Sequence, residues 1–193
     1  MATFPFETCE AVSSGIAQPV SASINAVSCA VVFYYFVKNK SVLLLAVLLF
    51  QAFHAFSHAV HLPGATQTNV AHALAYLVNA ALFYVGHRRT GLYPSSFILG
   101  IVVSDLHAFF TLPLFYYVVT QAALFLSLAA FYVPLLAVKP LAATAAVILL
   151  LVLNEKLNCE RMLAAYPSVP FHALVEIAGL VFFYLVSKSF YKV

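Results

Sequence analysis

The chain consists of long apolar runs separated by short breaks that contain charges, glycines or prolines. Each run is close to the ~20 residues that an α-helix needs to cross the hydrocarbon core of a membrane. Breaks such as Lys38–Lys40, Leu62–Gly64 and His87–Pro94 contain the residues that interrupt helices. The pattern therefore predicts seven helices, over Val20–Val37, Ser41–His61, Asn69–Gly86, Ser95–Thr111, Leu114–Val138, Leu141–Leu153 and Val169–Lys188. Only Pro113 interrupts residues 95–138, so six spans are the alternative.

The composition agrees with a membrane protein. Only 8% of the residues are charged and the mean hydropathy is +1.01, whereas soluble domains contain roughly 25% charged residues. We therefore predict an all-α polytopic membrane protein, with residues 1–193 forming one seven-helix bundle and residues 1–19 a short outer segment. The basic residues are scattered between the spans, which gives no indication of nucleic-acid binding.

The distribution of basic residues predicts an orientation, because Lys and Arg favour the cytoplasmic side. With seven spans and an outer N-terminus, the inner segments contain Lys38, Lys40, Arg88, Arg89, Lys139, Lys188 and Lys192. The outer segments contain only Lys156 and Arg161. We therefore expect the N-terminus outside or in the lumen and the C-terminus in the cytoplasm, in an endomembrane (ER or Golgi) or in the plasma membrane.

Three histidines and a glutamine share one face of the second predicted helix. Gln51, His54, His58 and His61 are spaced three, four and three residues apart, which places them on one stripe, and Ser57 lies one turn before His61. Ionisable groups are costly inside a membrane, so a cluster of them indicates a functional site.

Two other helices are expected to bring polar groups to the same depth. His172 and Glu176 lie one turn apart at the start of the seventh predicted helix, and Asn69 and His72 lie in the first turn of the third. In the predicted orientation, these starts and the end of the second helix lie just inside the outer surface. We therefore expect one polar cluster there.

The residue types in this cluster suit a zinc ion. His61, His172 and Glu176 would supply two nitrogens and one oxygen and leave a fourth position for water, as catalytic zinc sites do. Zinc lowers the pKa of a bound water toward ~7, which makes a nucleophile at neutral pH. Supporting side chains would be His54, His58, Asn69 and Asp105, the last with either a proton-relay or substrate-binding role or a structural one. A haem held by paired histidines is an alternative, since His54 and His61 are two turns apart and His107 could be a partner.

The same residues resemble a known family. Ser57-x-x-x-His61 on the second span, a polar residue early in the third and a pair one turn apart opening the seventh resemble the CREST-type transmembrane hydrolase superfamily. This superfamily includes the alkaline ceramidases and the adiponectin/progestin receptors. The resemblance implies a zinc ion that activates water to hydrolyse a lipid amide, with a membrane lipid as substrate. Ser57 and His72 would orient the water or help to stabilise the developing oxyanion.

The chain departs from the family pattern at two ligand positions. His72 stands where the family has an aspartate, and Glu176 stands where it has the last histidine. Two histidines and a glutamate are nevertheless a known catalytic zinc set. The N-terminal segment lacks the tryptophan-bearing acidic loop that the ceramidases use for calcium.

The cysteines fit the outer position of the N-terminal segment. Cys9 precedes the first span and Cys159 lies in the predicted loop Asn154–Ser168, so both would be outside, where disulfides persist. The similar ceramidases tie these two regions together, which implies a Cys9–Cys159 disulfide here. Glu155 and Lys156 are expected to form a pair at the membrane interface.

Two other functional classes compete with a hydrolase. One is a non-catalytic receptor or scaffold with a structural metal, in which His72 closes the site as fourth ligand. The other is a histidine-rich metal or proton transporter, which needs a polar path from His61 through His58, His54 and Gln51 to the cytoplasmic face. The apolar run Leu43–Phe50 on the same helix argues against the transporter.

Overall fold

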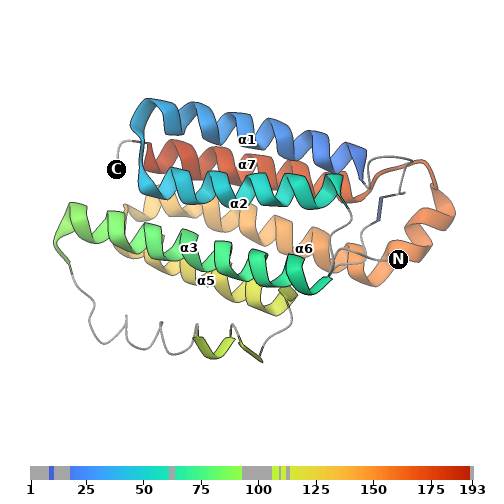
Figure 1. The fold of residues 1–193 in the computed structure, drawn as a ribbon. Helices are drawn as coiled ribbons and strands as arrows, with labels where there is room; N and C mark the ends of the chain where they lie inside the picture. The colour runs from blue at the N-terminus through green and yellow to red at the C-terminus, as the bar shows by residue number, and fades with distance from the viewer. Residues whose placement is uncertain are drawn as a thin grey trace.

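The computed structural model describes residues 9–10, 18–60, 64–92, 106–108, 110–111 and 114–191, and these residues contain helices but no strands (Figure 1). The long helices are α1 (Pro19–Asn39), α2 (Val42–Ala59), α3 (Gly64–Thr90), α5 (Leu114–Tyr132), α6 (Leu135–Ala165) and α7 (His172–Phe190). Five of them are long and apolar enough to cross a membrane. In α5 the apolar helical stretch over Tyr116–Tyr132 is shorter. The protein is therefore an all-α integral membrane protein.

The six helices form a ring. Each contacts the next in the order α1, α2, α3, α5, α6 and α7, and α7 contacts α1 and also α2. The first residues of α1, α3, α5 and α7 and the last residues of α2 and α6 lie at the same end of the bundle (Figure 1). That end carries the Cys9–Cys159 disulfide and is called the disulfide end below.

Helices α3 and α5 run side by side in the same direction. Nδ2 of Asn79 donates to Oε1 of Gln121 (2.7 Å), and the closely packed Gly86 faces the ring of Tyr132. Asn79 thus pairs with Gln121, and Gly86, further along α3, pairs with Tyr132, further along α5. Consequently, α3 ends at the opposite end of the bundle from the point where α5 begins (Figure 1).

The apolar core fills the half of the bundle away from the disulfide end. Val32, Leu43, Leu82, Val186 and Phe190 are at most 1% exposed and belong to one packed cluster. They come from the second halves of α1, α3 and α7 and from the first turn of α2. Polar side chains are buried mainly in the other half, which separates the molecule into an apolar region and a polar one.

The segment before α1 is attached to the helix ends by polar contacts. The buried carboxylate of Glu10 accepts the backbone N–H of Ser21 (3.2 Å), which satisfies a donor that the first turn of a helix leaves unpaired. A carboxylate at this position also interacts favourably with the helix dipole. The backbone N–H of Gln18 donates to the carbonyl of His58 at the end of α2 (2.9 Å).

Helices α1, α2, α3 and α7 occupy the predicted spans with shifted ends, but the predicted break between Leu114–Val138 and Leu141–Leu153 is wrong. The chain turns at Pro134, which is extended (φ −56°, ψ 138°), and α6 starts directly after it. A proline disfavours helical backbone in the residue before it, so α5 ends just before this turn. Pro140 lies inside α6. The predicted helix Ser95–Thr111 falls largely outside the described residues.

Helix α6 is also longer than predicted, because it continues through the expected loop Asn154–Ser168 to Ala165. Residues 154–165 include leucine, glutamate, lysine, arginine, methionine and alanine, which all favour helices. Their polarity suggested a loop, whereas their propensity continues the helix. Glu155 and Cys159 consequently lie one turn apart on the same helix.

Candidate metal centre

Four side chains from two helices converge at the disulfide end. The last two turns of α2 present His54 and His58, and the first two turns of α7 present His172 and Glu176. Oε1 of Glu176 lies 2.9 Å from Nε2 of His172, 3.0 Å from Nε2 of His58 and 3.3 Å from Nε2 of His54. One carboxylate oxygen therefore faces three imidazole nitrogens.

The cluster is buried except on one side. His58 is 0% exposed and His172 and Glu176 are each 4% exposed, whereas the side chain of His54 is 28% exposed. The rings of His54 and His58 are stacked with centroids 4.8 Å apart. His54 is thus the member of the cluster that a molecule from outside can reach.

In His58 and His172, the Nδ1 atom, which faces away from Glu176, is hydrogen-bonded to an oxygen acceptor. Nδ1 of His58 donates to Oε1 of Gln18, and Nδ1 of His172 donates to Oε2 of Glu155 (2.8 Å). In a neutral imidazole the other nitrogen then carries a lone pair. In that neutral form both Nε2 lone pairs point toward the Glu176 carboxylate, whereas a protonated ring would donate a hydrogen bond to it.

A second layer of amides fixes the orientation of Glu176. Nδ2 of Asn25 donates to Oε2 of Glu176 (2.8 Å), and Nε2 of Gln51 donates to Oδ1 of Asn25. This arrangement leaves Oε1 of Glu176 to face the imidazoles. The buried Oε1 of Gln51 has no hydrogen-bond partner among the described residues.

The donor set fits a divalent cation. His54, His58 and Glu176 each offer a ligand atom, and these atoms lie within 4.8 Å of one another. Ligands about 2.0–2.1 Å from a tetrahedral zinc lie roughly 3.3 Å apart, close to the spacing here. Two buried carboxylates, Glu155 and Glu176, also contact the imidazoles, and a divalent cation would offset charges that are costly to bury. This group of residues could therefore hold a metal ion.

The structure brings together only some of the predicted site residues. His172 and Glu176 meet as expected, and His54 and His58, expected as supporting side chains, lie in the cluster itself. His61 and Asp105 lie outside the described residues, so their predicted roles stay predictions. His107, the possible haem partner, is exposed.

Three further predicted residues have other surroundings. The hydroxyl of Ser57 donates to the carbonyl of His54 (2.8 Å). The ring of His72 packs against Tyr117 of α5 with centroids 4.1 Å apart, and Asn69 is exposed on α3. The roles predicted for Ser57 and His72 in orienting a water molecule stay predictions.

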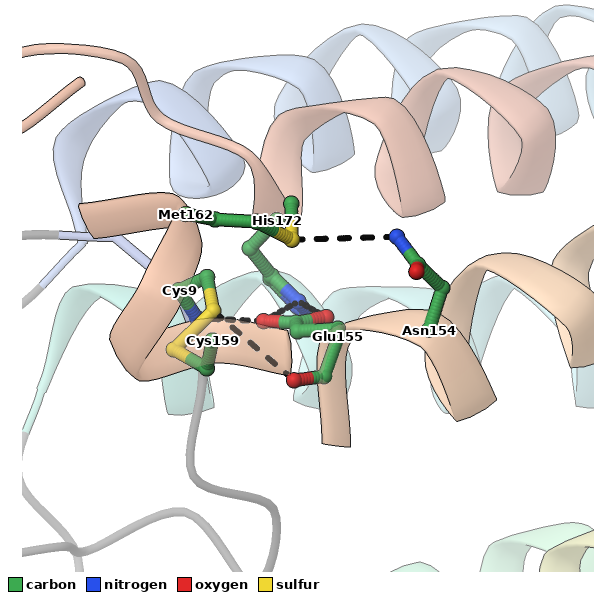
Figure 2. Close-up of a disulfide and its surroundings, with 6 residues drawn as sticks. All are labelled: Cys9, Asn154, Glu155, Cys159, Met162 and His172. Atoms are coloured by element: carbon green, nitrogen blue, oxygen red, sulfur yellow. Dashed lines mark hydrogen bonds and ion pairs between the residues drawn. A yellow bond between two sulfur atoms is a disulfide. The ribbon is translucent and has the colours of Figure 1, made fainter. Parts of the chain in front are cut away.

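Cys9 and Cys159, the pair implied by the resemblance, are joined by a disulfide with a Cα–Cα distance of 5.5 Å (Figure 2). Glu155, expected at the membrane interface, is instead only 5% exposed and bonded to His172. The expected Glu155–Lys156 interface pair is therefore wrong, because Glu155 points inward while Lys156 is exposed.

Sequence reasoning missed Gln18, Asn25 and Glu155. Asn25 lies four residues after Ser21 and three before Ser28, which gives α1 a polar stripe at helical spacing. All three residues of this stripe are buried. For Glu155 the available signal was its position one turn before a cysteine expected to be bridged. The sequence around Gln18 contains no comparable pattern that would have indicated its contact with His58.

Comparisons with protein-family models, with curated proteins and with solved structures found no match.

Proposed function

We propose that this protein is a zinc-dependent transmembrane hydrolase of a lipid amide, with His58, His172 and Glu176 as zinc ligands. The observation that carries the proposal is the convergence of two imidazole nitrogens on a buried carboxylate oxygen at 3.0 and 2.9 Å. If both imidazoles are neutral with the proton on Nδ1, these atoms repel one another, and a cation would turn the repulsion into three bonds. Two histidines and one glutamate form a known catalytic zinc set.

The proposed reaction needs zinc for one task and protein groups for the others. Zinc supplies a Lewis acid that activates water at neutral pH. His54 borders the ligands on the exposed side, with its Nε2 2.9 Å from Nε2 of His58. There it is placed to hydrogen-bond a substrate carbonyl or to accept a proton. Asn25 and Gln51 hold Glu176 in position behind the site.

The position of the cluster supports a lipid substrate. It lies within the apolar helices α2 and α7 near one end of the bundle, at a depth that a lipid amide near the headgroups can reach. The basic residues Lys38, Lys40, Arg88, Arg89 and Lys188 lie at the opposite end of the bundle. This distribution supports a lumenal or extracellular disulfide end.

The parallel arrangement of α3 and α5 supports seven spans. Leu92 follows the end of α3, and Leu114 begins α5 at the disulfide end. The end of α3 and the start of α5 therefore lie at opposite ends of the bundle. The helix proposed over Ser95–Thr111 would supply the crossing between them, since about 20 residues suffice for one.

A structural metal is the second candidate, and one observation favours it. Nε2 of His54 lies 3.3 Å from Oε1 of Glu176, so His54 could be a fourth protein ligand. Four protein ligands would close the site to water, as in structural zinc sites. The protein would then be a non-catalytic receptor or scaffold.

Metal content tests the first part of the proposal. The wild-type chain, purified without chelators, is expected to contain about one zinc per chain, and His172→Ala and Glu176→Gln much less. His87→Ala is the matched control, because His87 lies in the last turn of α3 at the other end of the bundle. Equal zinc content in the wild type and in His172→Ala would refute the site.

Fatty-acid release from a panel of lipid amides, followed by mass spectrometry, tests the second part. We expect zinc-dependent release by the wild type and by His87→Ala, and none by His172→Ala. A zinc-loaded protein that hydrolyses no lipid amide would favour the structural candidate.

A further inference from the structure

Glu155 is a buried carboxylate that is not among the proposed zinc ligands. It lies in α6 between the exposed residues Asn154 and Lys156, yet it is only 5% exposed itself. Both its oxygens face Nδ1 of His172, at 3.0 and 2.8 Å. Figure 2 shows this carboxylate between His172 and the disulfide.

The disulfide holds a hydrogen-bond donor beside this carboxylate. The backbone N–H of Cys9 donates to Oε1 of Glu155, and Cys9 is bridged to Cys159, one turn after Glu155 in α6 (Figure 2). A buried carboxylate requires such donors, because leaving it unpaired is costly. Glu155 therefore has a fixed position rather than a range of rotamers.

The same segment also fixes the first residue of α7. The backbone N–H of His172 donates to the carbonyl of Cys9 (3.3 Å). His172 is thus held at its main chain by Cys9 and at its ring by Glu155. These two contacts determine which way Nε2 of His172 points.

We propose that Glu155 is the positioning residue of the metal site: by accepting the Nδ1 proton of His172, it directs the Nε2 lone pair toward Glu176 and makes it a stronger ligand. This inference rests on the proposed zinc site. A carboxylate bonded to the far nitrogen of a ligating histidine fixes its tautomer and raises its basicity, and losing it typically weakens metal binding by roughly 10–100-fold.

Zinc affinity, measured by competition with a chromophoric chelator, tests the inference. Glu155→Gln keeps the shape and one acceptor oxygen but loses the charge, and we expect it to bind zinc roughly 10–100-fold more weakly than the wild type. Glu155→Ala should be weaker still. Glu160→Gln is the matched control, because Glu160 is an exposed glutamate on the same helix, and its affinity should equal that of the wild type.

The absorption spectrum of the cobalt-substituted protein separates positioning from folding. A well-folded Glu155→Gln should show a cobalt spectrum altered from that of the wild type and of Glu160→Gln, since the ligand field reports the orientation of His172. Unchanged zinc affinity and an unchanged cobalt spectrum in Glu155→Gln would overturn the role of Glu155 and leave the metal site standing. A wild-type chain that binds neither metal would overturn both.

Discussion

At the residue scale, the site is built around Oε1 of Glu176, which faces His54 and His58 of α2 and His172 of α7. His54, His58 and His61 share one stripe, so spacing alone does not distinguish them. Helix α2 ends at Ala59 and Val60 is extended (φ −127°, ψ 138°), so the helix as described contains His54 and His58. His58 faces Glu176 because α7 packs against α2. Such packing has no local sequence signal.

His54→Ala distinguishes the two candidate functions. We expect this variant to retain zinc, because His58, His172 and Glu176 still provide three ligands. Hydrolysis should fall by roughly 10²–10⁴-fold if His54 takes part in proton transfer. Zinc content and fatty-acid release are measured on the same preparation, beside His58→Ala, which should lose both. Loss of zinc from His54→Ala would instead identify His54 as a ligand of a closed site.

At the element scale, the long apolar helices were predictable from hydropathy, whereas the boundary between α5 and α6 was not. Pro134 and Pro140 both lie in the apolar stretch that the pattern divides. Only Pro134 marks a turn, and Pro140 is accommodated inside α6. Pro134 precedes the first residue of α6, where a proline removes no intrahelical hydrogen bond. Pro140 lies inside the helix, where a proline removes one. The hydropathy pattern does not distinguish these two positions.

Gly86 is expected to be essential for the contact between α3 and α5. A Cβ at this position would overlap the ring of Tyr132, so Gly86→Ala should destabilise the protein by roughly 1–3 kcal/mol through overpacking. Gly179→Ala is the matched control, since the nearest described atom to its Cβ, Oε2 of Glu176, would lie at 3.9 Å, an ordinary contact distance. Thermal unfolding in detergent measures both. Equal unfolding temperatures for Gly86→Ala and the wild type would contradict this close approach.

The disulfide should stabilise both the fold and the metal site. It joins residues 150 positions apart, and removing a native disulfide typically costs about 2–5 kcal/mol. We expect Cys9→Ser/Cys159→Ser to unfold at a lower temperature and to bind zinc more weakly, because the segment that holds Glu155 loses its anchor. Cys29→Ser is the control, since Cys29 is a free thiol in α1. Unaltered zinc affinity in the double variant would show that the anchor is dispensable.

At the scale of the whole molecule, the sequence predicted a helical membrane bundle with a polar cluster at one end. It did not predict the closed order of helix contacts or the apolar core that fills the other half. Those features depend on which faces pack together, and a helix that is apolar on most sides does not specify its neighbours. The polar residues were easier to locate because the membrane makes their burial costly.

The proposed orientation predicts opposite locations for the two chain ends. In sealed microsomes an epitope tag at the N-terminus should be protected from protease, and a tag at the C-terminus should be digested. The reason is an odd number of crossings together with the basic residues at the end opposite the disulfide. Protection or digestion of both tags together would indicate an even number of spans.

X-ray absorption at the zinc edge of the purified wild-type protein tests the metal site most directly. The account predicts nitrogen and oxygen neighbours about 2.0–2.1 Å from zinc, with the outer scattering of imidazole rings, and loss of the signal in His172→Ala. Zinc that is absent, or that has sulfur neighbours near ~2.3 Å, would contradict the account.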